Sequence, residues 1–147
     1  MDGAVGFSPG VFDLFHVGHL DVLRRAERSC GRLVAGVLAD ELAEDLLGTR
    51  PIVPLIERME IVGNCRHVAE VVALTHADLR RAWRDLRFDV LFAGPPDAVV
   101  PADAETLLDG TGARVVRFTD LVETASPALR AALAGESGEA GVRTSVA

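Results

Sequence analysis

The chain has 147 residues, of which 49% are hydrophobic and 25% are charged, and its formal net charge is −7. This length predicts one domain with a buried core, and no apolar run approaches the length of a membrane span. The negative charge argues against general nucleic-acid binding, because that function needs a basic surface that displaces counterions.

The N-terminal residues lack the basic start and the apolar segment of a signal peptide, so we expect a cytoplasmic protein. Cys30 and Cys65 show no metal-ligand spacing, and we expect reduced, buried thiols instead of a disulfide framework. All 15 basic residues are arginines, so any anion site must draw its positive charge from a few of them.

A phosphate site is predicted near the start of the chain. An apolar run at 4–7 predicts a strand, an amphipathic run at 20–30 predicts a helix, and a glycine-bearing turn joins them. Backbone N–H groups and the positive end of the helix dipole converge at such a turn. His16 and His19 lie one helical turn apart and can point into the same site, and Gly18 between them leaves room for a ligand. Imidazoles there can donate to phosphate oxygens that gain charge during transfer, although a structural role or a metal pair with a third ligand are the alternatives.

The string Gly-Val-Phe-Asp-Leu-Phe-His-Val-Gly-His at 10–19 matches the pattern GxFDxxHxGH. It resembles the signature of the cytidylyltransferase branch of the HxGH nucleotidyltransferases, which includes the glycerol-3-phosphate and ethanolamine-phosphate enzymes. The resemblance implies a Rossmann-like α/β fold with a five-stranded parallel sheet, order 3-2-1-4-5, flanked by helices. It also implies transfer of CMP from CTP with release of pyrophosphate and a need for Mg²⁺. Within the motif it makes His16 and His19 catalytic and assigns nucleotide binding to Gly10, Val11, Phe12, Asp13 and Gly18.

The apolar run at 32–38 predicts a strand buried on both faces of a parallel sheet. With the preceding strand and helix it forms a right-handed βαβ unit whose ligand crevice lies at the carboxyl ends of the strands. Asp40 lies just past this end. The family resemblance makes Asp40 a candidate acceptor-binding residue, and a helix N-cap is the alternative.

Two prolines at 51 and 54 precede a helical pattern over 55–65. The segment resembles a family stretch whose basic residues meet the triphosphate and the acceptor. This resemblance makes Arg58 a catalytic candidate and Arg50 an acceptor-binding candidate. The relatives' lysines before the first proline are absent here, since 44–48 is Glu-Asp-Leu-Leu-Gly.

The stretch at 66–72 resembles the family's Arg-Tyr-Val-Asp-Glu-Val block, which makes Arg66 an acceptor-binding candidate; a solvated arginine at a helix end is the alternative. A strand is expected at 68–74. Thr75 then opens a helix that runs to about residue 87, where Trp83 packs in the core against Leu79.

A buried strand is predicted at 88–94, followed by Gly-Pro-Pro-Asp where relatives carry an acid-rich turn near the cytosine and ribose. Gly94 and Asp97 retain the nucleotide-binding role in that turn. A short helix at 102–108, a fifth strand at 113–118 and a last helix at 126–134 follow. The family's last phosphate-binding motif aligns with 123–130, where Thr124 and Ser126 are the nucleotide-binding candidates.

The predicted organisation is a cytidylyltransferase domain at 1–134 and a flexible tail or linker at 135–147, which allows a larger bifunctional chain. The predicted partners are CTP and a small anionic acceptor, a phosphonate such as 2-hydroxyethylphosphonate or a phosphate such as glycerol 3-phosphate, with neither nucleic acid nor membrane. Mg²⁺ is held mainly by nucleotide phosphates, and the resemblance favours a homodimer. An adenylyltransferase and a non-catalytic nucleotide-binding or oligomerisation module are the alternatives.

Overall fold

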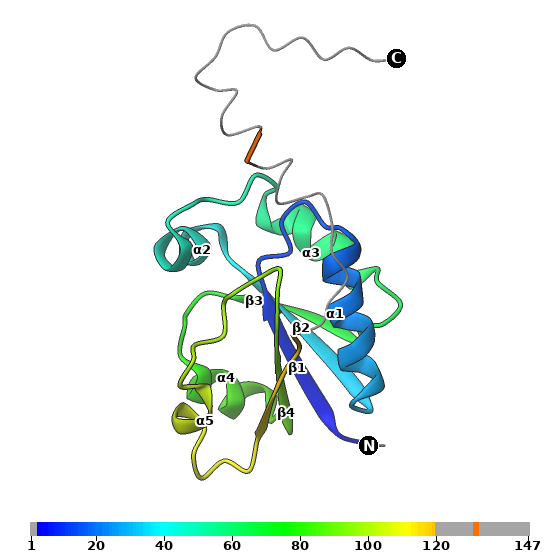
Figure 1. Ribbon diagram of the computed structural model, residues 1–147, viewed down its shortest axis with the longest axis vertical. Coiled ribbons are helices and arrows are strands. Elements are labelled where there is room, and N and C mark those ends of the chain that lie inside the picture. Colours follow the sequence, from blue (N-terminus) through cyan, green and yellow to red (C-terminus); the bar gives the residue numbers. More distant parts are fainter. Residues whose placement is uncertain (1–2, 120–130, 133–147) are drawn as a thin grey trace, which may run out of the picture.

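A computed structural model describes residues 3–119 and 131–132. Its five strands form one parallel sheet in the order β3-β2-β1-β4-β5, flanked by helices, which confirms the predicted fold class (Figure 1). Along the chain the elements are β1 (Val5–Gly10), α1 (Val17–Arg28), β2 (Arg32–Leu38), α2 (Asp40–Leu47), α3 (Leu55–Gly63), β3 (Glu70–Leu74), α4 (Leu79–Leu86), β4 (Val90–Ala93), α5 (Ala104–Leu107) and β5 (Arg114–Arg117).

Two hydrophobic clusters hold the helices on opposite faces of the sheet. Alternate residues of β2 point to opposite faces, so that Leu33, Ala35 and Val37 join one cluster and Val34 joins the other. The first cluster packs under α1 and α3, and the second under α4 and α5 (Figure 1). Because all strands are parallel, their carboxyl ends meet at one edge, where the loops after β1, β2 and β4 come together.

Several element boundaries differ from the sequence-based predictions. β1 continues to Gly10 and α1 begins at Val17, so the connecting loop is only six residues long. The N-cap of α4 is Asp78, whose side chain accepts from the N–H of Arg81 at 3.1 Å, so the prediction of Thr75 as the cap was wrong. The predicted last helix and tail lie largely outside the described residues.

Cys30 and Trp83 match their predicted packing roles, whereas Cys65 is less buried than predicted. Cys30 is a buried free thiol whose pKa is raised by burial, and Cys65 is a half-buried free thiol. Trp83 packs against the same cluster as Leu79, and the guanidinium of Arg87 lies 4.5 Å from its ring centre. Among the described residues, no helix is long and apolar enough to cross a membrane.

Candidate active site

The loop between β1 and α1 is held in an unusual backbone conformation. Phe12 and Leu14 have φ values of 55° and 49°, a left-handed region that costs residues with a Cβ about 1–3 kcal/mol each. Gly10 is required because an added Cβ would lie 2.8 Å from Oδ2 of Asp97. Strain of this kind persists only where the surrounding structure imposes it, so the loop is a rigid feature of the site.

The two imidazoles of the motif cap helix α1. Nδ1 of His16 accepts from the N–H of Gly18 at 3.0 Å, and Nδ1 of His19 accepts from the N–H of His16 at 3.2 Å. In each neutral ring the proton therefore lies on Nε2, which makes Nε2 the donor. The ring centres are 4.1 Å apart, and both residues line one cavity.

Asp97 joins this loop to the segment after β4. Its Oδ2 accepts from the N–H groups of Val11 at 3.0 Å and Phe12 at 2.9 Å, and it lies 3.5 Å from Nε2 of His19. The N–H groups of Val11, Phe12, His16 and Gly18 are thus already paired within the protein. The expectation that backbone N–H groups of this turn lie free for a phosphate is therefore corrected: in this arrangement side-chain donors face the cavity.

The Asp97 carboxylate contributes stability that depends on pH. Burial alone would raise the pKa of Asp97, but the hydrogen bond and charge of His19 and the N–H groups of Phe12 and Val11 outweigh burial and lower it from 3.8. A lowered folded pKa gives stability that is present above the unfolded pKa and is lost as the pH falls through the folded value. This contribution therefore disappears at a pH below 3.8.

Replacing Asp97 by Asn tests this assignment. We expect the free energy of unfolding at pH 7 to fall by about 1–3 kcal/mol, because one acceptor of charge-assisted hydrogen bonds is lost. Below a pH of 3.8, the unfolding free energy of the variant should change less with pH than that of the parent. Urea unfolding across this range measures both effects, and identical pH profiles would contradict the assignment.

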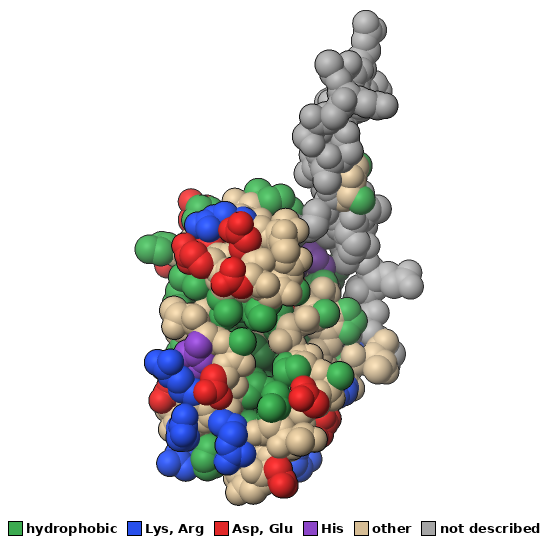
Figure 2. Space-filling model, turned by 90° about the vertical axis from the view of Figure 1, so that its left-hand side faces the viewer, with side chains coloured by type: hydrophobic (Ala, Val, Ile, Leu, Met, Phe, Trp, Pro, Cys, Tyr) green, Lys and Arg blue, Asp and Glu red, His purple; other side chains and the backbone are tan. Residues whose placement is uncertain are grey.

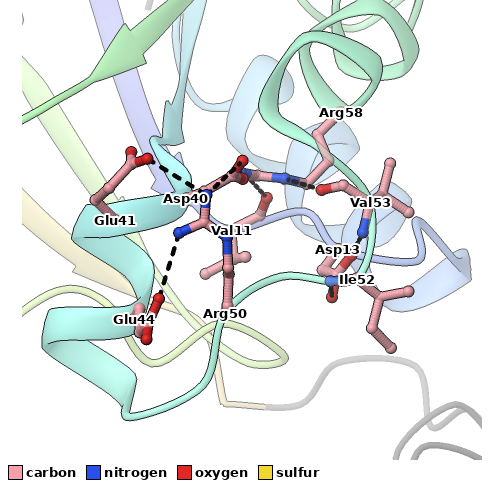
Figure 3. A network of polar contacts seen from close by, with 9 residues as sticks. All are labelled: Val11, Asp13, Asp40, Glu41, Glu44, Arg50, Ile52, Val53 and Arg58. Carbon is pink, nitrogen blue, oxygen red and sulfur yellow. Dashed lines mark hydrogen bonds and ion pairs between the residues drawn. The ribbon is translucent and has the colours of Figure 1, made fainter.

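Arg58 and Asp13 tie the loop to the segment that precedes α3 (Figure 3). The guanidinium of Arg58 donates to the carbonyl oxygens of Val53 at 2.8 Å and Val11 at 2.7 Å, and to Oδ1 of Asp40 at 2.5 Å. The Asp13 carboxylate accepts from the N–H groups of Ile52 and Val53, both at 2.9 Å. These crossed contacts fix the two segments relative to each other.

The burial of Arg58 corrects its predicted role. Its side chain is 0% exposed and its guanidinium donates to protein acceptors, so the described geometry does not support direct contact with a triphosphate. Its charge instead pairs with Asp40, which lies in the first turn of α2 after the N-cap Ala39. Asp40 is therefore not the N-cap, and its carboxylate contacts Arg58 and Arg50.

Arg50 is the cation at the mouth of the site. Its exposed guanidinium lies 3.4 Å from Glu44, 3.3 Å from Glu41 and 3.8 Å from Asp40, all from α2 (Figure 3). The hydrogen bonds that Arg50 donates to Glu44 and Glu41 raise the pKa of Arg50, so it stays charged. Exposed pairs of this kind contribute little stability, and the side chain can exchange its carboxylate partners for a ligand anion.

A cavity of about 370 Å³, a size typical of small-molecule sites, brings together six of the predicted site residues: Val11, Asp13, His16, His19, Arg50 and Asp97. It is lined by Val11, Asp13, His16, His19, Leu47, Thr49, Arg50, Pro51, Pro96 and Asp97. Gly10 at the end of β1, Phe12 in the loop and Gly18 in the first turn of α1 adjoin the residues that line it. Leu47, Thr49, Pro51 and Pro96 also line the cavity but were not predicted as site residues, although Thr49 and Pro51 neighbour Arg50 in the sequence.

Arg66 does not belong to this cavity. It is exposed and contacts His67, whose Nδ1 lies 2.9 Å from Glu27 near the end of α1. The cavity lies at the start of α1, and eight helical residues from His19 to Glu27 span about 12 Å. The prediction that Arg66 binds the acceptor at this site is therefore not supported within one chain.

Gly94 borders a second hollow of about 330 Å³ on the β4 and β5 side. Pro96 and Asp97 line both this hollow and the imidazole-lined cavity, so the two lie next to each other. Thr124 and Ser126 lie outside the described residues. Within the part of the chain that is described, no group of three His, Cys, Asp or Glu side chains is arranged to hold a metal ion.

A 3-2-1-4-5 parallel sheet with an HxGH loop at its carboxyl edge defines the class of Rossmann-like nucleotidyltransferases. The family described as cytidylyltransferase-like matches residues 7–134. The chain belongs to this cytidylyltransferase-like family, which confirms the resemblance and the enzyme class predicted from the motif.

Named relatives and solved structures agree with this assignment. The bifunctional protein HldE of Gluconacetobacter diazotrophicus is 39% identical over 116 residues, covering 76% of this chain and 23% of the relative. The ethanolamine-phosphate cytidylyltransferase of Arabidopsis thaliana is 31% identical over 114 residues, covering 73% of this chain and 25% of the relative. The chain thus spans about a quarter of the length of these relatives. A lipopolysaccharide core biosynthesis protein from Thermoplasma volcanium shares the fold with a TM-score of 0.72 and 21% identity, covering 80% of this chain and 97% of that one.

Proposed function

We propose that this domain transfers CMP from CTP to a small phosphate or phosphonate acceptor and releases pyrophosphate. The observation that carries the proposal is the pair of imidazoles whose Nδ1 atoms are fixed by backbone N–H groups, in a cavity that also holds Arg50. This arrangement leaves Nε2 as the donor of each ring at the positive end of α1. The name of the Arabidopsis relative supports CMP transfer to a phosphorylated acceptor.

In the proposed reaction an acceptor oxygen attacks the α-phosphorus of CTP in line with the leaving group. The new oxygen–phosphorus bond forms as the bond to the bridging oxygen breaks, and pyrophosphate leaves with the bonding electrons. His16 donates from Nε2 to phosphate oxygens that gain charge, and His19 does so once its Nε2 exchanges Oδ2 of Asp97, 3.5 Å away, for the ligand. Arg50 holds anionic groups at the mouth. The hollow beside Gly94 receives the nucleoside.

Mg²⁺ enters this proposal with the nucleotide. Asp13 and Asp97, the carboxylates that line the cavity, accept backbone N–H groups and so fit poorly as metal ligands. Phosphate oxygens are ligands that Mg²⁺ prefers, and the ion would neutralise charge on the triphosphate.

A homodimer and a longer bifunctional chain also belong to the proposal. The apolar side chains of Ile52, Ile56 and Ile61 are 59%, 80% and 46% exposed beside the site, which suits burial against a second copy. Sedimentation velocity would measure the mass of the particle. The HldE relatives are named bifunctional and are about four times longer than the matched segment.

A pyrophosphate-release assay with CTP or ATP tests the activity. The acceptors are glycerol 3-phosphate and 2-hydroxyethylphosphonate. We expect kcat/KM with CTP to exceed that with ATP by about tenfold or more. The reverse preference would indicate an adenylyltransferase, and CTP binding in calorimetry without pyrophosphate release from any acceptor would indicate a non-catalytic module.

A further inference from the structure

A separate apolar cavity of about 320 Å³ opens on the face formed by α2, α4 and the segment at 98–101. Figure 2 shows this face, with hydrophobic side chains gathered in its middle, acidic side chains above them and arginines below. The lining residues are mostly apolar and include Leu38, Leu42, Leu46, Leu47, Leu74 and Val99. The small polar acceptors of the proposed function contain nothing that would fill this cavity.

The apolar cavity adjoins the imidazole-lined one. Leu47 lines both. Pro9 and Ala98 line the apolar cavity. They lie two residues before Val11 and directly after Asp97, which both line the imidazole-lined cavity. One ligand can therefore place a phosphate near the imidazoles and a carbon chain between α2 and α4.

Helix α2 exposes two large apolar side chains. Ala43 is its only fully buried residue, whereas Leu46 and Leu47 are 46% and 44% exposed. Both leucines line the apolar cavity. Covering such surface with an apolar group is favourable, roughly in proportion to the area removed from water.

His16, His19 and Arg50 line the imidazole-lined cavity and not the apolar one, and this sets the direction of a ligand. Asp78 lies at the rim of the apolar cavity, and its pKa is lowered mainly by the hydrogen bond from the N–H of Arg81, so it is ionised at neutral pH. A second anionic group would meet this carboxylate. The phosphate end is favoured on the side of Arg50 and the imidazoles.

We propose that the acceptor is an organic phosphate or phosphonate with an apolar carbon portion that occupies the cavity between α2 and α4 and with no second anionic group. This inference rests on the proposed function, because it concerns the acceptor of the same site. It replaces a short polar acceptor by an amphipathic one.

The test is the assay with CTP and methyl, n-butyl and n-hexyl phosphate as acceptors, on the full chain. We expect kcat/KM to rise about fourfold per buried methylene, the equivalent of about 0.8 kcal/mol. Ala77 is exposed and lines the cavity, so Ala77→Phe should fill it and abolish the advantage of the longer acceptors. Ala69→Phe is the matched control, an exposed alanine at the opposite end of the sheet that should keep the parent's ratio.

A flat kcat/KM along the series in the parent, with transfer observed, would overturn the inference and leave the proposed function standing. If no acceptor yields pyrophosphate, calorimetric titration compares the affinities of methyl and n-hexyl phosphate and tests the inference without the reaction. Tighter binding of hexyl phosphate by the parent and Ala69→Phe, but not by Ala77→Phe, would support the cavity's ligand class although transfer fails. Equal binding of both phosphates by the parent would overturn the inference.

Discussion

Replacing His16 by Asn is expected to lower kcat for nucleotidyl transfer by about 10²–10³-fold, the usual effect of removing one preorganised donor. His16 has two functions that this change separates. Its Nδ1 caps α1 by accepting from the N–H of Gly18, and Asn is among the best N-cap residues. Its Nε2 donor is the proposed catalytic group, and the shorter Asn side chain cannot place a donor at the same position. The expected change in unfolding free energy is therefore within about 0.5 kcal/mol.

The matched control is His67→Asn, the same substitution near the other end of α1. His67 contacts Glu27 at 2.9 Å and does not line the imidazole-lined cavity. We expect its kcat to stay within about twofold of the parent, because His67 contacts Glu27, about 12 Å along α1 from His19. If kcat of His16→Asn were within tenfold of the parent's, the proposed role of the imidazole would be wrong, and urea unfolding of both variants would show that each remains folded.

The sheet and the motif loop could be predicted because their signals are local. The apolar run at 32–38 became β2 with the predicted bounds, and the strand order followed from the family resemblance. The contacts that shape the site are not local. Asp97 accepts a hydrogen bond from Val11, 86 positions away in the sequence, and Arg58 donates one to Val11, 47 positions away. No spacing pattern in the sequence predicts contacts of this range.

Residue roles carried over by resemblance depended on where the fold places each side chain. Arg50 and the imidazoles line one cavity, and their roles toward a ligand stay predictions. Arg66 matches a family block by sequence but lies on the turn before β3, at the amino ends of the strands. A motif gives identity and order along the chain, whereas contact with a ligand requires the carboxyl end of the sheet.

The apolar cavity could not be predicted from the sequence for a different reason. The leucines at 38, 42, 46 and 47 were visible as apolar positions, but core packing explains such positions equally well in a sequence. The exposed fractions of Leu46 and Leu47 show that these two side chains are not part of the core, and a sequence does not give such fractions.

Replacing Arg58 by Met is expected to lower the free energy of unfolding by about 3 kcal/mol, the low end of the cost of removing one partner of a buried pair. Its 0% exposed guanidinium satisfies two carbonyl oxygens and the Asp40 carboxylate, all of which would lose a partner. Arg50→Met is the matched control, because Arg50 also contacts Asp40 but is 53% exposed. We expect its unfolding free energy to change by no more than about 1 kcal/mol.

The conservative variant Arg58→Lys distinguishes two roles of Arg58: a clamp that holds the loop through hydrogen bonds within the protein, and a direct contact with phosphate. Lysine keeps the charge but cannot donate to three acceptors in the planar geometry of a guanidinium. A clamp that positions the loop through the carbonyl of Val11 predicts that urea stability and kcat fall together in Arg58→Lys. A direct contact with CTP predicts a raised KM at unchanged unfolding free energy, and that result would return Arg58 to the ligand side of the site.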